Sequence, residues 1–206
     1  MKTIDKKQVY SLGRYTYKNF VTLSEDETRL VWNWRNDERI CRWMTNKEQI
    51  PYENHLRFIE GLKEREDKYY WLVYKDDKPI AVFDIVDVDY QHGETEPGYY
   101  LCPDLLNSGE GLFFNYNFRR ILFDVFGFQS VKGNIKIGND RALMMSTFFQ
   151  VKPFGIAMFE DGEHLLMKGN REEFSTVQEK GLLKNFVRYA KTCVTDWDDL
   201  IKQFRK

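Results

Sequence analysis

The order of strand-like and helix-like segments is the feature that most constrains this sequence. Alternating or continuous apolar runs predict strands over residues 15–23, 69–74, 80–88, 94–102, 131–137, 153–160 and 164–168. Apolar residues at helical spacing predict helices after the first, fourth and fifth of these strands. The predicted order is strand, helices, three strands, helix, strand, helix, two strands. This order indicates mixed α/β (α+β) structure with one sheet, because a regular βαβ alternation is not present.

Polar residues mark where two of these helices begin. Ser24 and Glu27 form a capping box, in which each side chain accepts a hydrogen bond from an orphan amide at the helix start. Shorter helical segments follow over residues 38–44 and 52–65. Asn139 comes directly after a predicted strand and is a good N-cap for the next helix.

Charge and cysteine usage exclude several classes of protein. The 206 residues carry 31 Lys and Arg against 32 Asp and Glu, a formal net charge of −1, which argues against a basic nucleic-acid-binding surface. No run of about 18 apolar residues is present, so we expect no membrane span. Cys41, Cys102 and Cys193 are far apart, which predicts neither a disulfide framework nor a metal site. With a polar start over residues 1–10, these features predict a cytoplasmic protein.

The C-terminal segment differs from the rest. From Leu182 to Phe204 apolar residues follow a helical spacing, which predicts one long helix or two helices with a break near Thr195. We therefore divide the chain into a domain over residues 1–169 and a helical extension over residues 170–206. The apolar stripe of this extension either packs on its own domain or forms a contact with a partner, for example in a homodimer.

A loop with two glycines precedes the helix that runs to about residue 126. Ser108-Gly109-Glu110-Gly111 follows a strand that Pro103 ends. Amides at a glycine-rich helix start, together with the helix dipole, suit a pyrophosphate. Neither a Walker loop nor a dinucleotide fingerprint is present, and ordinary turn glycines explain the pattern equally well.

Several motifs together resemble a known superfamily. They are the glycine loop, Asn139-x-x-Ala142 at the following helix, Trp34-Arg35-Asn36, His55-Leu56-Arg57-Phe58-Ile59 and Glu96-Pro97-Gly98-Tyr99-Tyr100-Leu101-Cys102-Pro103-Asp104. In order and spacing the chain is similar, over residues 15–168, to the GNAT superfamily of acetyl-CoA-dependent N-acetyltransferases. Within it, the chain resembles the subgroup that acetylates a UDP-linked 4-amino sugar in pseudaminic acid biosynthesis.

The resemblance implies a fold and a cofactor site. The GNAT fold has a single, mostly antiparallel sheet, flanked by helices and splayed between its fourth and fifth strands, here 94–102 and 131–137. Acetyl-CoA would bind as co-substrate in this gap, with its pantetheine arm on the backbone of Leu101 and Cys102 and with Asn139 on the other side. The pyrophosphate would lie at the loop and helix start, formed by Ser108, Gly109, Glu110, Gly111 and Leu112.

The resemblance also points to residues for the chemistry. A neutral amine must attack the thioester, so Glu96 or His55 would accept its proton, and a backbone amide near Leu101, at an expected strand bulge, would bind the developing oxyanion. The usual tyrosine acid is replaced by Ser146, which would relay a proton unless another residue donates it or the thiolate leaves unaided. The Gln or Arg usual at the loop start is replaced by Leu106.

Substrate contacts are expected from the first helices and the strand ends. Arg35 and His55 would contact nucleotide phosphates, and Met44, Phe58 and Tyr100 would line an apolar wall for a deoxy-sugar methyl group. Surface ion pairing for Arg35 and ordinary packing for the other side chains are the structural alternatives. Asp84 and Asp87 lie in the third predicted strand, and their spacing does not decide whether they face the cleft.

These features predict an N-acetyltransferase that transfers acetyl directly to a UDP-linked amino sugar, without a covalent enzyme intermediate or a metal. No cysteine lies in a motif that would indicate a nucleophile. Two other functions fit the same sequence. One is an acetyltransferase for a protein N-terminus, as for ribosomal proteins. The other is a non-catalytic GNAT-like module that binds acyl-CoA, which the replacements at Leu106 and Ser146 would permit.

Overall fold

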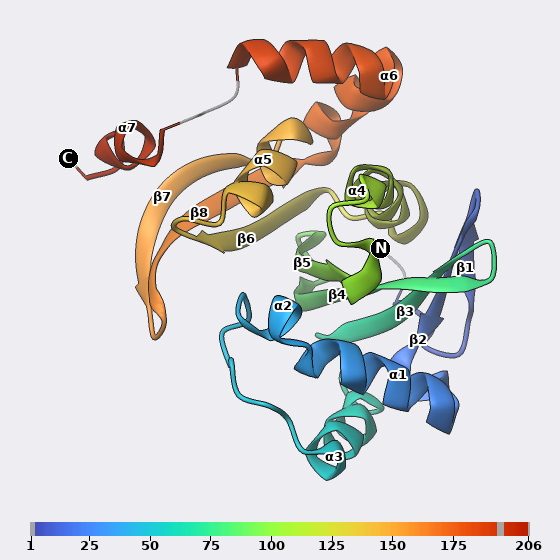
Figure 1. Cartoon of the computed structure of the whole chain (residues 1–206). Coiled ribbons are helices and arrows are strands. Elements are labelled where there is room, and N and C mark those ends of the chain that lie inside the picture. The colour runs from blue at the N-terminus through green and yellow to red at the C-terminus, as the bar shows by residue number, and fades with distance from the viewer. Residues whose placement is uncertain (1–2, 193–195, 206) are drawn as a thin grey trace.

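A computed structural model describes residues 3–192 and 196–205 and contains one eight-stranded sheet (Figure 1). The spatial order of the strands is β1-β2-β3-β4-β5-β6-β8-β7. The strands are β1 (Tyr10–Leu12), β2 (Tyr15–Asn19), β3 (Tyr69–Lys75), β4 (Lys78–Asp89), β5 (Glu94–Leu101), β6 (Ser130–Lys136), β7 (Lys152–Phe159) and β8 (Gly162–Asn170). The single mixed sheet confirms the predicted fold class.

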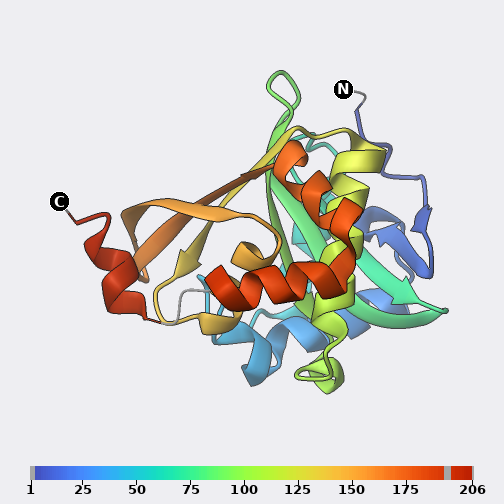
Figure 2. The same ribbon diagram turned by 90° about the horizontal axis from the view of Figure 1, so that it is seen from above.

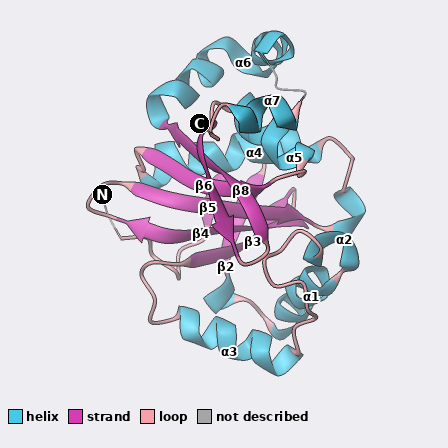
Figure 3. Cartoon of the chain, turned by 90° about the vertical axis from the view of Figure 1, so that its left-hand side faces the viewer, coloured by secondary structure: helices cyan, strands magenta, loops and turns pink. Residues whose placement is uncertain are grey.

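Helices cover both faces of this sheet (Figure 3). On one face lie α1, α2 and α3, and on the other lie α4, α5 and α6 (Figures 1 and 3). The helices are α1 (Glu25–Asn36), α2 (Glu38–Cys41), α3 (Tyr52–Leu62), α4 (Glu110–Arg120), α5 (Asp140–Phe148), α6 (Arg171–Thr192) and α7 (Trp197–Lys202). No helix in the described ranges combines the length and hydropathy needed to cross a bilayer.

The joint between β5 and β6 is the feature that creates the site. Every other neighbouring pair of strands is antiparallel, whereas β5 and β6 are parallel and pair only at Glu94 with Ser130 and at Thr95 with Val131. From Glu96 to Leu101, β5 therefore has no strand partner on its β6 side. The unpaired backbone groups in this gap need other hydrogen-bond partners.

Two apolar clusters fix the sheet between the helices. Alternate residues of β4 point to opposite faces, so Phe83 packs in the main cluster under α4 while Val82 packs with Phe20 and Val31 in the smaller one. The side chains of Trp71 and Phe83 are fully buried, and each contributes about 1.5–3 kcal/mol of transfer free energy or more. The same alternation places Asp84 on the α1 face, beside Val82.

Local signals were predicted well, and some boundaries were wrong. The capping box of Ser24 and Glu27 is confirmed, as is the Asn139 cap, whose side chain accepts from the Ala142 amide. The strand predicted over 15–23 ends at Asn19, because the Asn19 side chain accepts from the Val21 amide and starts a 3₁₀ turn. The helix predicted to 126 changes to π geometry over Ile121–Phe126. The unpredicted β1 begins at Tyr10, where the polar N-terminal segment ends.

The C-terminal segment packs on the preceding domain. Phe174, Val177 and Leu200 belong to the main cluster, and Figure 2 shows α6 as two helical arms crossing above α4. The bend lies at Gly181, which has φ 72° and ψ 161°. The break predicted near Thr195 lies outside the described residues.

Candidate active site

A cleft of about 920 Å³ passes through the gap between β5 and β6. It is lined from the α1 side by α1, the segment after α2, and α3, and from the other side by α4 and α5. Most of the predicted site residues line it together: Arg35, Met44, His55, Phe58, Glu96, Tyr100, Leu101, Gly109, Gly111, Asn139 and Ser146. Cys102, Ser108, Glu110 and Leu112 are not among the lining residues.

The glycine loop has the backbone geometry that its residues suggest. Gly109 precedes α4 with φ 84°, in the left-handed region that favours glycine, and a Cβ there would meet nothing within 4 Å. A Cβ at Gly111 would lie 3.6 Å from Leu101 Cδ1 and Met145 Cε. The start of α4 is therefore open at Gly109 and in contact with β5 and α5 at Gly111.

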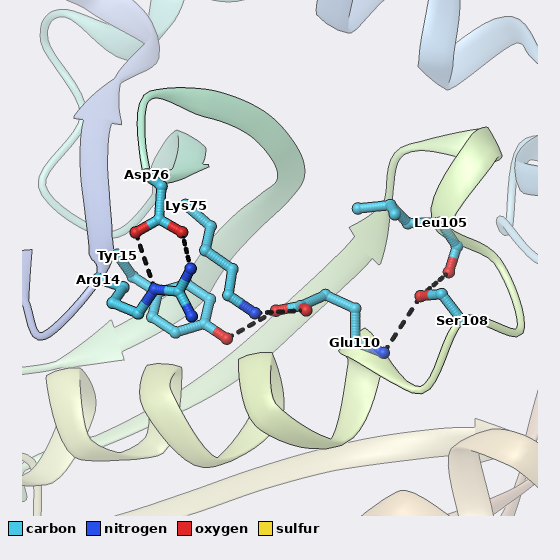
Figure 4. Close-up of polar contacts among 7 residues, drawn as sticks. All are labelled: Arg14, Tyr15, Lys75, Asp76, Leu105, Ser108 and Glu110. Carbon is cyan, nitrogen blue, oxygen red and sulfur yellow. Dashed lines mark hydrogen bonds and ion pairs between the residues drawn. The ribbon is translucent and has the colours of Figure 1, made fainter.

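The side chain of Glu110 points away from Ser108 and toward Tyr15 and Lys75 (Figure 4). Its two oxygens accept from the Tyr15 hydroxyl and from Lys75 Nζ, each at 2.6 Å. The Glu110 amide donates to Ser108 Oγ at 3.2 Å, and the Leu112 amide donates to the Gly109 carbonyl at 3.1 Å. The amides of Glu110 and Leu112, both predicted to bind pyrophosphate, are thus engaged within the chain.

Two residues of the α5 segment face the cleft with a polar group available. Asn139 Oδ1 is engaged in the helix cap at 3.2 Å, which leaves its amide NH₂ as a donor. The Ser146 backbone carbonyl accepts from the Val151 amide at 2.8 Å. The Ser146 hydroxyl forms no hydrogen bond with any residue in the described ranges.

Glu96 reaches across the gap to β6. Its Oε1 accepts from Asn134 Nδ2 at 3.0 Å, and Asn134 Oδ1 in turn lies 2.5 Å from His164 Nδ1. The other ring nitrogen of His164 lies 2.8 Å from Asp161 Oδ1. Burial, followed by the charge of Asp87, raises the pKa of Glu96. Glu96 is therefore a held carboxyl with more proton affinity than a surface glutamate.

Asp84 is a second carboxyl on the same side of the sheet. It pairs with Gly98 across β4 and β5, and a Cβ at Gly98 would lie 2.8 Å from both Asp84 oxygens. The half-buried carboxyl accepts no hydrogen bond from any described residue. Burial, with a further contribution from Glu96, raises the pKa of Asp84 to about 7. The close approach of Asp84 to the strand requires glycine at position 98.

His55 is present in the cleft as a neutral, buried ring. Burial lowers its pKa to about 4, against a smaller opposite effect of a hydrogen bond to the Thr28 backbone. Its Nε2 is buried without a hydrogen-bond partner among the described residues. The ring is stacked on Phe58 with centroids 6.5 Å apart. At neutral pH His55 is a weak base.

Basic residues outnumber acidic residues in the lining of the cleft. Arg35 donates to the Asn46 carbonyl at 2.6 Å, while its Nη1 is buried without a partner in the described chain. The guanidinium of Arg35 also lowers the pKa of Tyr100 against the larger effect of burial. Arg39, Arg42, Lys132 and Arg141 also line the cleft, and Arg119 lines it from α4 as a buried residue. This charge suits phosphate-bearing ligands.

One expectation on the site is wrong, and two unpredicted residues belong to it. The strand bulge expected near Leu101 is wrong, because β4 and β5 stay in register from Ala81 with Leu101 to Val86 with Glu96, and the register shifts after Val86. Asn134, which donates to Glu96, and His164, which contacts Asn134, carry no sequence signal, since only the β6–β8 pairing brings them together. The described residues contain no group of three His, Cys, Asp or Glu side chains that could hold a metal.

Comparison with known proteins identifies the family. No family model matches the chain. Acetyltransferase PseH of Campylobacter jejuni serotype O:2 is 33% identical over 128 residues, which cover 62% of this chain and 78% of that protein. The chain belongs to the GNAT acetyltransferase family, close to PseH. PseH of C. jejuni serotype O:23/36 is 37% identical over 93 residues, 45% of this chain and 57% of that protein.

Solved structures agree with this GNAT assignment at the level of the fold. The crystal structure of C. jejuni PseH in complex with acetyl coenzyme A has a TM-score of 0.60 at 24% identity, covering 76% of this chain and 99% of that one. Spermidine N-acetyltransferase from Vibrio cholerae, in complex with CoA and spermine, has a TM-score of 0.70 at 12% identity, covering 79% and 98%. The predicted resemblance to GNAT N-acetyltransferases close to PseH is confirmed.

Proposed function

We propose that this GNAT acetyltransferase transfers the acetyl group of acetyl-CoA to the amine of a nucleotide-linked amino-deoxy sugar. The observation that carries the proposal is the two-sided cleft. The gap between β5 and β6 opens beside the glycine loop at one end and meets Asp84 and Glu96 on the α1 face. The PseH similarity supports the sugar nucleotide as the class of acceptor.

The acyl donor would bind on the backbone of the gap. The backbone groups of Leu101 that have no strand partner on the β6 side would bind the pantetheine arm. The backbone of Cys102, the next residue, would bind the same arm. The free amide of Asn139 would bind the arm from α5. The helix start at Gly109 and Gly111, with Ser108, Glu110 and Leu112 around it, would receive the pyrophosphate once the Ser108 hydroxyl releases the Glu110 amide.

The acceptor would enter from the α1 face. Arg35 and the neighbouring arginines would bind the diphosphate, since a guanidinium holds phosphate oxygens at two points. His55 Nε2, buried without a described partner, would accept a hydrogen bond from the substrate. Met44, Phe58 and Tyr100 would form the apolar wall for the sugar methyl group.

Proton transfer follows from the two carboxyls. An ammonium must lose a proton before its nitrogen can attack the thioester carbonyl, and a base with a pKa near the working pH is best suited to accept it. The pKa of Asp84, about 7, fits this requirement. The charge of Glu96 beside it contributes to raising that pKa, and the pKa of Glu96 is itself raised. The new C–N bond forms as the C–S bond breaks, and Ser146 relays to the leaving thiolate the second proton that the nitrogen loses as it becomes an amide. Burial raises the pKa of the Cys102 thiol, which argues against a covalent acyl-enzyme.

The test is a thiol-release assay with acetyl-CoA and a UDP-linked 4-amino sugar. We expect turnover by the wild type, with kcat/KM rising through about pH 7, and a loss on the order of 10²–10⁴-fold in Asp84→Asn and Glu96→Gln. Asp77→Asn, an exposed carboxyl in the β3–β4 turn, is the matched control. Binding of acetyl-CoA without thiol release would instead indicate a non-catalytic acyl-CoA-binding module. Release with a ribosomal-protein N-terminus and not with the sugar would indicate the protein acetyltransferase.

A further inference from the structure

Arg119 on α4 is a buried cation in the wall of the cleft. The residue is only 5% exposed, and its Nε donates to Asn115 Oδ1 at 3.0 Å. Its guanidinium carbon lies 5.2 Å from the ring centre of Phe118 and 5.4 Å from that of Phe149. No carboxylate pairs with Arg119 within the described ranges. A buried charge without a counterion costs several kcal/mol, so a ligand is the natural source of its partner.

The acceptors beside Arg119 are already occupied, and donors remain free in the described chain. Asn115 Nδ2 donates to the Tyr99 hydroxyl at 2.7 Å, so the phenol hydrogen of Tyr99 is directed elsewhere, and it reaches no acceptor among the described residues. A guanidinium has donors and no acceptor. Tyr99, Asn115 and Arg119 all line the cleft. This part of the cleft therefore presents a positive charge and free donors, which is the complement of a carboxylate.

The position of these residues along α4 says which part of a bound acyl donor would reach them. A Cβ at Gly111 would lie 3.6 Å from Leu101 Cδ1, so the two residues are neighbours. Asn115, one turn later, bonds to Tyr99, two residues back along β5. Arg119 lies one further turn along, about 13 Å from Glu110 at the helix start at 1.5 Å per residue. If the pyrophosphate lies at the glycine loop and the arm pairs at Leu101, the acyl group extends toward Arg119.

Asp84, where the proposed function places the acceptor amine, and Arg119 lie on opposite sides of the sheet. Tyr99 alternates with Gly98 and Tyr100, so its side chain points to the α4 face, away from Asp84. The sheet thus separates the carboxyls of Asp84 and Glu96 from the hydrogen-bond donors around Arg119. An anion bound beside Arg119 would not face these carboxyls directly.

We propose that Tyr99, Asn115 and Arg119 bind the free carboxylate of a dicarboxylic acyl thioester, such as malonyl-CoA or succinyl-CoA, as a second class of acyl donor. The proposal rests on the proposed function, because it uses the same cleft and the same transfer. The amine nitrogen forms the C–N bond as the C–S bond breaks and CoA leaves as its thiolate. The first amine proton goes to Asp84, the second reaches the thiolate through Ser146, and the distal carboxylate is unchanged.

The test measures calorimetric affinities of the wild type for CoA thioesters matched in length. Malonyl-CoA is compared with butyryl-CoA, and succinyl-CoA with pentanoyl-CoA, which also distinguishes the two carboxylate positions. We expect malonyl-CoA or succinyl-CoA to bind about tenfold or more tightly than its neutral match. A buried charge-assisted hydrogen bond contributes about that factor to an affinity. Arg119→Met should abolish this preference and leave the affinity for unacylated CoA unchanged.

Tyr99→Phe provides a second variant that keeps the ring and removes one donor, and it should reduce the preference several-fold. A melting temperature of Arg119→Met no lower than that of the wild type would show that the variant is folded. Equal or tighter binding of the neutral esters to the wild type, or a preference that survives in Arg119→Met, would overturn this inference alone. Failure of every CoA ester to bind would overturn the proposed function as well.

Discussion

Asp84→Asn should make the ligand-free protein more stable at alkaline pH while it removes activity. The pKa of Asp84 rises from 3.8 to about 7 in the folded chain, chiefly through burial. Each unit of pKa is equivalent to about 1.4 kcal/mol, so keeping Asp84 ionised in the fold costs at most about 4 kcal/mol. Because the carboxyl is only half-buried, roughly 2–4 kcal/mol is the range we expect.

The sign follows from proton binding. Between about pH 4 and pH 7 the folded state keeps the Asp84 proton and the unfolded state loses it, so the stability of the wild type falls as the pH rises. Asparagine has no such proton. The advantage of Asp84→Asn should therefore grow by up to about 1.4 kcal/mol per pH unit over this window and stay constant above it.

The assay is urea unfolding of both proteins without ligand from pH 4.5 to pH 8.5. Asp77→Asn, exposed in the turn of the same hairpin, should show no such trend and serves as the control. A stability difference that does not change with pH would refute the raised pKa of Asp84. A wild type more stable than Asp84→Asn at pH 8 would refute it as well. Stability gained together with lost turnover is the pattern of a residue kept for function.

Three further substitutions test other parts of the site. Asn139→Ala should lower stability by about 1 kcal/mol through the lost cap and weaken acetyl-CoA binding, whereas Asn139→Asp keeps the cap oxygen and should weaken binding alone, measured by calorimetry beside thermal melts. Gly98→Ala should displace Asp84, because its Cβ would lie 2.8 Å from both carboxyl oxygens; we expect kcat to fall at least tenfold with an unchanged Kd for acetyl-CoA, and unchanged kcat would contradict the packing. Glu110→Gln should cost about 1–2 kcal/mol, because it weakens a half-buried ion pair, without loosening CoA binding; a large rise in Kd would show that this side chain serves the ligand.

Signals that act within a few residues were visible in the sequence. The Ser24 capping box and the Asn139 cap depend on amides two or three residues away, so residue type and spacing are enough to predict them. The fold class followed from the order of such local elements together with the resemblance to the GNAT superfamily.

Contacts that depend on strand register were not visible. Asp84 acquires its environment from Gly98, and Glu96 acquires its partner from Asn134 on β6, and neither neighbour is close in sequence. Arg119 is a charged residue on a helix, and such a residue is ordinarily exposed. It is only 5% exposed here, because β5 and the end of α5, where Phe149 contacts the guanidinium, cover it. A single sequence contains the residue types for these contacts and no measure of the distances between them.

The short joint between β5 and β6 has a consequence for how the molecule opens. In the described chain, strand pairing joins β5 to β6 at only two residue pairs, whereas β6 pairs with β8 along its whole length. Segments tied by few hydrogen bonds open as separate cooperative units, and their amide protons exchange with solvent at rates of their own. We expect β6, β8 and β7 to exchange as one unit in the free protein. A thioester arm hydrogen-bonded to both strands would join the two units, so amides far from the ligand would report its arrival.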